Sequence, residues 1–334
     1  MKKQLFGTLP TGEEVYAYTL TNSVASVTFI TRGATITDFT VFGTSIVGGF
    51  ADLETYLLDT SHQGAIIGRV ANRIGNASFT MDGKTYEVPK NNLGKHCLHG
   101  GRGFDYRIFN VTDVTENSIT FTYVSEDGEE GFPNRLHLEV TYTLTEATLQ
   151  IDYKATPEGK TPIILTNHAY FHLDGFGGTV HNHSAQIFAD TYTELDSEQI
   201  PTGRRLPVQG TPLDLNTPTR LGERINDTFT GYDHYYQTKP QTQQTFNGKK
   251  LGLVAKVDNG KLQMRVYTDQ PGLQFYTANT MGKGPDFKGG IKKINHGAFC
   301  LETQTEPNCI SRGEEFYNAG ETYTQSTVYE LVKL

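Results

Sequence analysis

The chain has 334 residues, 20% of them charged and 36% hydrophobic, which is typical of a globular protein with a sizeable core and excludes a disordered or fibrous chain. Its formal net charge of -8 argues against a nucleic-acid partner, because such binding relies on a basic surface. The three cysteines are too few and too unevenly spaced for a disulfide framework, and no stretch is apolar enough for secretion or membrane spanning. We therefore expect a cytoplasmic protein with a small polar partner; the sequence leaves its oligomeric state open.

Short runs of alternating apolar and polar residues, bounded by turn residues, recur along the chain and predict antiparallel strands. In chain order, the expected elements are a short helix over 52–58, a hairpin of 76–81 with 84–88, strands over 136–144 and 149–155, a short helix over 219–225, and a hairpin of 253–258 with 261–268. The last hairpin turns at Asn259-Gly260, a pair that predicts a type I′ turn. No βαβ alternation, linker or repeat is present. The pattern predicts an all-β fold with few short helices, a large antiparallel β-sandwich forming a single domain over residues 1–334.

Five segments concentrate histidine, acidic, amide and arginine side chains where a plain strand does not need them. They are residues 68–75 (GRVANRIG), 97–104 (CLHGGRGF), 166–175 (TNHAYFHLDG), 231–236 (GYDHYY) and 299–304 (FCLETQ). Glu302 follows an apolar run and is expected at or near a buried strand, where burial raises the pKa of a carboxyl toward that of a general base. A structural ion pair with an arginine explains the same position equally well. The aspartate and aromatic residues of 231–236 suit the binding of a sugar.

Two pairs of histidines have spacings that would place both members on one face of a helix, as in some metal sites. They are His168 with His172 and His96 with His99. Neither stretch reads as a helix. As a strand, residues 165–173 would place His168, Tyr170 and His172 on one face, without an obvious third metal ligand. We therefore expect no metal site, and we expect residues 181–183 (HNH) to form a polar loop.

Seven short patterns follow one another in an order that is similar to a known family. They are GRVANRI, LHGGRGFD, DGEEGFP, TNHAYFHL, GYDH, QPGLQFYTAN and CLETQ. Each is weak alone, but their joint order from Arg69 to Gln304 resembles the aldose 1-epimerase (galactose mutarotase) family, and the similarity extends from Phe29 to Tyr323. The resemblance implies a large antiparallel β-sandwich and an isomerase that interconverts the α and β anomers of free aldoses such as galactose and glucose. Ring opening and closure involve no redox step, so no cofactor is expected.

The resemblance also implies roles for single residues. His168, through NHAYF, resembles the general acid that protonates the ring oxygen, and Glu302, through CLETQ, resembles the general base that takes the O1 proton. His99 in LHGG resembles a second active-site histidine. The other resemblances concern substrate binding: Asn72, Arg73 and Asp233 resemble sugar-hydroxyl ligands, Tyr170 lies in the same strand as His168, and Gln274 resembles a residue that orients the catalytic carboxylate.

Departures from the family pattern leave the substrate preference open. Ala169 stands where the family often has serine, His172 stands where it often has asparagine, and two tyrosines follow the Asp-His pair of GYDH. The sequence does not decide whether the preferred substrate is a free hexose, a disaccharide such as maltose, or a sugar phosphate.

Two other functions also remain open. A non-catalytic carbohydrate-binding sandwich would need no acid-base pair and is mildly disfavoured because the chain has no tryptophan for stacking. A glycoside hydrolase would use two carboxylates, which Glu302 and Asp233 could supply.

Overall fold

The computed structural model describes residues 2–228 and 230–334, which build three larger antiparallel sheets and four two-stranded ribbons. The N-terminal sheet is a series of hairpins with the strand order β1-β2-β3-β4-β5. Its strands are β1 (Lys2–Thr8), β2 (Glu14–Thr21), β3 (Ala25–Ile30), β4 (Thr35–Val41) and β5 (Thr44–Ser45).

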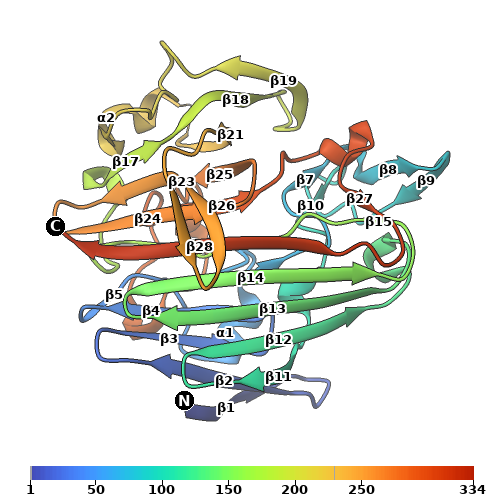
Figure 1. Ribbon diagram of the computed structural model, residues 1–334, viewed down its shortest axis with the longest axis horizontal. Coiled ribbons are helices and arrows are strands. Elements are labelled where there is room, and N and C mark those ends of the chain that lie inside the picture. Colours follow the sequence, from blue (N-terminus) through green and yellow to red (C-terminus); the bar gives the residue numbers. More distant parts are fainter. Residues whose placement is uncertain (1, 229) are drawn as a thin grey trace.

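A ten-stranded sheet, whose longest strands cross the front of the molecule in Figure 1, has the order β11-β12-β13-β14-β28-β24-β23-β17-β20, with β22 paired to β23. The strands are β11 (Asn110–Val114), β12 (Ser118–Ser125), β13 (Leu136–Thr145), β14 (Thr148–Pro157), β17 (Ser184–Ile187), β20 (Thr219–Arg220), β22 (Gln243–Phe246), β23 (Lys249–Asp258), β24 (Leu262–Thr268) and β28 (Tyr323–Lys333). The C-terminal strand β28 pairs with both β14 and β24 and so joins the two halves of this sheet.

The third sheet has the order β19-β18-β21-β25-β26. Its strands are β18 (Ala189–Leu195), β19 (Pro201–Pro207), β21 (Asp233–Thr238), β25 (Gly272–Tyr276) and β26 (Cys300–Gln304). The ribbons pair β6 (Ile66–Ile67) with β16 (Thr166–Asn167), β7 (Arg73–Ile74) with β10 (Cys97–Leu98), β8 (Ser78–Met81) with β9 (Lys84–Glu87), and β15 (Thr161–Pro162) with β27 (Phe316–Tyr317).

Helices are short. They are the α-helices α1 (Leu53–Leu58) and α2 (Leu221–Arg224) and the 3₁₀ turns η1 (Gly75–Ala77), η2 (Phe104–Tyr106), η3 (Glu129–Gly131), η4 (Val180–Asn182), η5 (Ile225–Asp227), η6 (Met281–Lys283), η7 (Lys288–Gly290) and η8 (Cys309–Arg312). None of the helices in the described part of the chain is long and apolar enough to cross a membrane.

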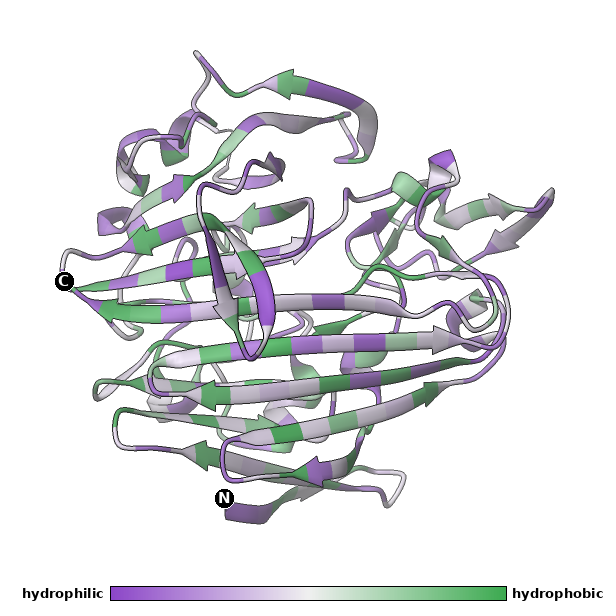
Figure 2. Cartoon of the chain, in the orientation of Figure 1, coloured by the Kyte–Doolittle hydropathy of each residue, from purple (hydrophilic) through white to green (hydrophobic). Residues whose placement is uncertain are grey.

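The main core lies between the ten-stranded sheet and the two five-stranded sheets. Along β13 every second residue is buried, as the alternation of a strand with one solvent face requires, and Figure 2 shows the resulting bands of hydropathy. One buried cluster contains Phe39 of the N-terminal sheet, Val140 and Ile151 of the large sheet, and Leu273 and Leu301 of the third sheet. The expected large antiparallel β-sandwich with few short helices is therefore confirmed.

The expected helix over 52–58 is α1, which begins after Asp52, whose carboxylate accepts a hydrogen bond from the Thr55 amide as an N-cap. The expected hairpin over 76–88 is β8-β9, and the one over 253–268 is β23-β24.

One local prediction is wrong, and one expected helix begins later than predicted. The turn between β23 and β24 is not type I′, because Gly260 but not Asn259 has a positive φ; the Asn259 side chain instead accepts hydrogen bonds from the amides of Lys261 and Leu262. The helix predicted over 219–225 begins only at Leu221, because the two residues before it pair as β20 with β17.

The segment 68–75 is anchored by Arg69, whose side chain is buried. Nη1 donates hydrogen bonds to the carbonyl oxygens of Pro133 and Asn134, both at 2.8 Å, and to the hydroxyl of Thr161 at 3.1 Å. Nη2 donates to the hydroxyl of Ser125 at 2.7 Å. Burial lowers the pKa of the guanidinium to about 10, yet these acceptors pair both Nη atoms, and only Nε has no hydrogen-bond partner among the described residues. Arg69 is thus a structural arginine, although it belongs to one of the five segments in which the sequence concentrates candidate functional side chains.

We predict that Arg69→Met lowers the free energy of unfolding by about 3 kcal/mol, because it leaves several buried acceptors without a donor. Urea denaturation followed by circular dichroism measures the change. Arg135→Met is the control: Arg135 is an exposed partner of Glu126, and its loss is expected to have a much smaller effect because solvent screens the pair. An equal effect of the two substitutions would contradict the anchoring role.

Candidate active site

One wall of the site is the face of the third sheet that points away from the main core. Side chains alternate along β25 and β26, so Leu273 and Leu301 pack in the core while Gln274 and Glu302 face the other side. Gln274 is paired directly with Glu302 across the two strands. Asp233, the first residue of β21, faces the same side, and the Gln274 amide nitrogen donates a 2.6 Å hydrogen bond to its carboxylate.

The opposite wall comes from the β7-β10 ribbon and the turns beside it. Asn72 and His99 both have a positive φ, and their backbones are joined by a 3.0 Å hydrogen bond from the His99 amide to the Asn72 carbonyl. The Asn72 amide in turn donates to His99 Nδ1 at 3.2 Å, which fixes the imidazole. Gly100 makes this approach possible, because a Cβ there would lie 2.5 Å from the carbonyl oxygen of Gly68. The glycine pair after His99 is thus a requirement of close packing.

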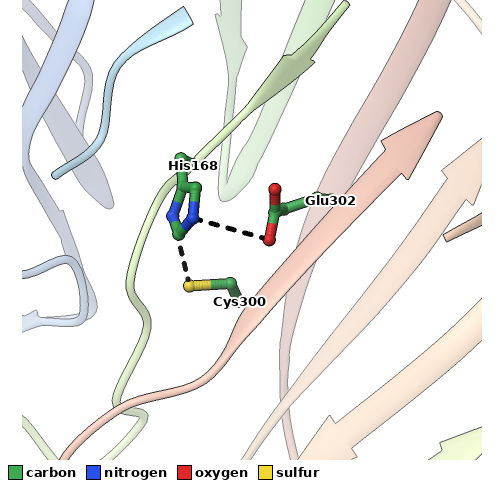
Figure 3. Close-up of side chains that lie close together, drawn as sticks. All are labelled: His168, Cys300 and Glu302. Atoms are coloured by element: carbon green, nitrogen blue, oxygen red, sulfur yellow. Dashed lines mark hydrogen bonds and ion pairs between the residues drawn. The ribbon is translucent and has the colours of Figure 1, made fainter. Parts of the chain in front are cut away.

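Between these walls lies His168, just after β16. Its backbone amide donates to the carbonyl of Ala65 and its carbonyl accepts from the amide of Gly64, both at 2.9 Å. The imidazole stacks on Tyr170, with ring centroids 4.9 Å apart. Its Nε2 lies 3.7 Å from Oε1 of Glu302. Figure 3 shows the two side chains facing each other. The strand and the turn thus bring together two residues that are far apart in the sequence.

All eight residues expected in the site line one cavity of about 1180 Å³. They are Asn72, Arg73, His99, His168, Tyr170, Asp233, Gln274 and Glu302. His172 does not join them; its ring lies against His183, at a centroid distance of 4.8 Å. His183 itself is fully buried, so the expectation of a polar loop over 181–183 is wrong for this residue.

Burial favours the uncharged form of the two facing groups. Burial, with a smaller contribution from the neighbouring His62, lowers the pKa of His168 to about 3. Burial also raises the pKa of Glu302 well above its usual range, with a further contribution from Asp233. Both shifts favour the uncharged forms, a neutral imidazole facing a carboxyl group that can supply a proton.

The surroundings of Glu302 bear on whether it is a general base or one member of a structural ion pair with an arginine. Of the basic side chains in the described residues, the one within ion-pair distance of Glu302 is His168, not an arginine. The Glu302 carboxyl also keeps one buried oxygen, Oε2, without a hydrogen-bond partner in this part of the chain. Gln274 does not orient this group as expected, because its amide nitrogen is bound to Asp233. A buried carboxyl that is free to exchange a proton fits these contacts better than a structural ion pair does.

Within the part of the chain that the structure describes, two groups of side chains have atoms close enough together to hold a metal ion. They are His168 with Cys300 and Glu302, and His172 with Asp174 and His183. In the first group Cys300 Sγ lies 3.6 Å from His168 Nδ1 (Figure 3), but burial raises the pKa of its thiol well above the usual range, so that the sulfur is a poor metal ligand. His96 does not combine with His99, because His96 Nδ1 accepts a hydrogen bond from the Asn76 amide.

Two residues beside the pair were not expected from the sequence. Cys300 contacts His168, and His62 lies with its ring 4.6 Å from that of His99. His62 is in none of the chemistry-bearing segments, and its partner Asp105 is 43 residues away. No local pattern could therefore have indicated it.

Comparison with known proteins finds relatives that match nearly the whole chain. The family model described as aldose 1-epimerase matches residues 16–330. The galactose mutarotase of Sus scrofa is 39% identical over 97% of this chain and 96% of its own length, and the aldose 1-epimerase of Escherichia coli is 33% identical over 85% and 84%. The crystal structure of an aldose epimerase homologue from C. elegans superposes with a TM-score of 0.85 at 25% identity, covering 95% of this chain and 99% of that one.

The chain belongs to the aldose 1-epimerase family. Its activity is that of an isomerase, an aldose 1-epimerase or mutarotase, as the full-length similarity and the shared fold show.

The neutral state of His168 predicts a pH dependence of stability. A histidine with a pKa of 6.5 in the unfolded chain and about 3 in the folded one takes up a proton on unfolding, so stability falls as the pH drops below about 6.5. His168→Asn removes this term. Its free energy of unfolding relative to wild type is expected to improve by about 2 kcal/mol between pH 7 and pH 5, measured by urea denaturation. His137→Asn, at an exposed histidine, should show no such change.

Proposed function

We propose that the chain interconverts the α and β anomers of free aldoses such as galactose and glucose, with Glu302 and His168 as the proton-transfer pair. The observation that carries the proposal is the position of these two side chains, 3.7 Å apart and buried at one cavity that polar and apolar side chains line together. Anomer exchange requires an acid at the ring oxygen O5 and a base at the hydroxyl O1. His168 can supply the acid and Glu302 the base.

The steps balance within the pair. On sugar binding, the proton of the Glu302 carboxyl passes to His168, so that carboxylate and imidazolium face the anomeric centre. Glu302 then takes the O1 proton, the C1–O1 bond becomes a carbonyl, the C1–O5 bond breaks, and O5 receives the proton of His168. The open-chain aldehyde rotates about C1–C2, and closure on its other face reverses both transfers. Opening returns the pair to the protonation that burial favours.

The other residues would hold the sugar so that both transfers occur at hydrogen-bond distance. Asp233, fixed by Gln274, accepts hydrogen bonds from sugar hydroxyls, and Arg73 and Asn72 act from the opposite wall. His99 lies beside His168, with ring centroids 5.2 Å apart. Burial lowers the pKa of His99 well below its usual range, which suits a neutral hydrogen-bonding group better than a second acid. The face of Tyr170 supports the His168 ring.

Two further features of the chain are proposals of the same kind. We propose that residues 1–334 fold as one domain, which is supported by a core cluster containing residues from Tyr18 to Leu331. A cytoplasmic location is supported by the three cysteines, all of which are free and buried.

The first functional prediction concerns the pair itself. Glu302→Gln and His168→Asn each delete one proton-transfer partner with little change in volume, and each should lower kcat at least about 100-fold. Polarimetry of freshly dissolved α-galactose and α-glucose measures the rate. His137 and Glu158 form an exposed pair at 2.7 Å, so His137→Asn and Glu158→Gln are matched controls that should leave the rate unchanged. Rates within tenfold of wild type for either active-site variant would reject the assignment.

The second prediction distinguishes ring opening from glycoside hydrolysis. A methyl glycoside carries carbon on O1 and offers Glu302 no proton, so both anomers of methyl galactoside should bind and remain unchanged. A glycosidase would instead protonate the exocyclic oxygen and release methanol. Proton NMR follows methanol and the ratio of methyl anomers. Methanol release in proportion to enzyme would favour Glu302 and Asp233 as a hydrolytic pair over the ring-opening mechanism.

A further inference from the structure

His62 lies beside the proton-transfer pair and has no role in the mechanism described above. Its ring centroid is 4.6 Å from that of His99 and 6.1 Å from that of His168. The residue lines the same cavity, and its side chain is 13% exposed. His62 therefore borders the space that the sugar would occupy.

A buried carboxylate holds the ring of His62. Nδ1 lies 2.7 Å from Oδ2 of Asp105, whose side chain is only 5% exposed. A carboxylate only accepts hydrogen bonds, so Nδ1 carries the hydrogen of this contact. Nε2 is then the nitrogen left to interact with other groups, and it has no hydrogen-bond partner among the described residues.

The charges behind His62 keep Asp105 in this role. Arg32 is buried, and it lines a small cavity of about 10 Å³ together with Asp59, His62 and Asp105. Burial lowers the pKa of Arg32, and the nearby charge of Asp105 opposes this lowering, as Tyr106 and Asp59 also do. Asp59 in addition pairs with the Nζ of Lys293 at 3.0 Å. A buried cation and Asp105 thus border the same small cavity behind His62.

His62 differs in this respect from its two histidine neighbours. Burial lowers the pKa of both His99 and His168, and a positive charge on His62 lowers each further. Neither of the two has a carboxylate within 3 Å, whereas His62 has Asp105. The hydrogen bond to Asp105 therefore fixes the orientation and tautomer of the His62 ring, as such bonds commonly do for metal-binding and catalytic histidines.

We propose that His62 is a substrate-contacting residue whose Nε2 hydrogen-bonds a hydroxyl of the bound aldose other than the one at C1. Asp105 is the positioning residue that fixes the ring. The assignment to a hydroxyl away from C1 follows because Glu302 and His168 account for O1 and O5. The inference rests on the proposed function in so far as it places an aldose in this cavity.

The test uses substitutions that keep one ring nitrogen or the other. The amide of glutamine reaches the position of Nε2, whereas the shorter amide of asparagine reaches that of Nδ1. His62→Phe and His62→Asn should bind methyl galactoside about three- to tenfold more weakly than wild type, which is the loss of one hydrogen bond, and His62→Gln should recover most of the affinity. Calorimetry measures the dissociation constants, and His137→Phe, at an exposed histidine bound to Glu158, is the matched control.

Deoxy sugars identify the contacted group. Methyl galactosides that lack the hydroxyl at C2, C3, C4 or C6 are compared one at a time, and one of them should bind wild type and His62→Phe with affinities within twofold of each other. Asp105→Asn should weaken binding to the same degree as His62→Phe and add nothing in the double variant. Thermal melts identify variants whose loss comes from unfolding.

Three outcomes would overturn the proposal: His62→Phe binds as well as wild type, every deoxy sugar shows the same loss, or His62→Asn rather than His62→Gln recovers affinity. The last result would assign His62 a structural role through Asp105 alone. These measurements use non-reacting sugars, so they test the His62 contact independently of catalysis. A failure of the proposed function would show separately, as the absence of enzyme-dependent mutarotation in polarimetry.

Discussion

The burial of an ionisable pair is the constraint on which the rest of this structure depends. Glu302 and His168 are 2% and 5% exposed, and each is held in its uncharged form by the loss of hydration. A proton that moves from one group to the other leaves the net charge unchanged. The cost of separating charge is then offset by the attraction between two groups 3.7 Å apart. A reaction that needs an acid and a base at once can therefore proceed between two buried side chains.

Such a pair must be held by rigid elements, because both groups must keep their positions without the support of solvent. β26 carries Glu302 between β25 and the ribbon strand β16, and it also packs Leu301 into the main core. The same strand thus contributes to stability on one face and to chemistry on the other. For this reason, substitutions in the core beneath β25 and β26 are expected to shift the side chains of the site.

The part of the fold that is local in sequence could be predicted, and the part that depends on distant partners could not. The alternation in β13 and the Asp-Gly turn between β8 and β9 are properties of neighbouring residues. The turn at Asn259 differs from the prediction because its side chain binds the two following amides, an option that the Asn-Gly pair does not reveal. At the site, Gln274 was expected to orient Glu302, but its strand position places it within reach of Asp233 as well, and it binds there.

By itself, the sequence determined the fold class, the family resemblance and the eight residues that line the cavity, because residue type and order along the chain carry this information directly. Only the tertiary structure decided which of these groups face each other, which protonation state burial favours, and that His62 joins them. The physical reason is that burial and charge coupling act through space. His62 and Asp105 are separated by 43 residues, and Cys300 and His168 by 132, yet both pairs are in contact in the folded chain.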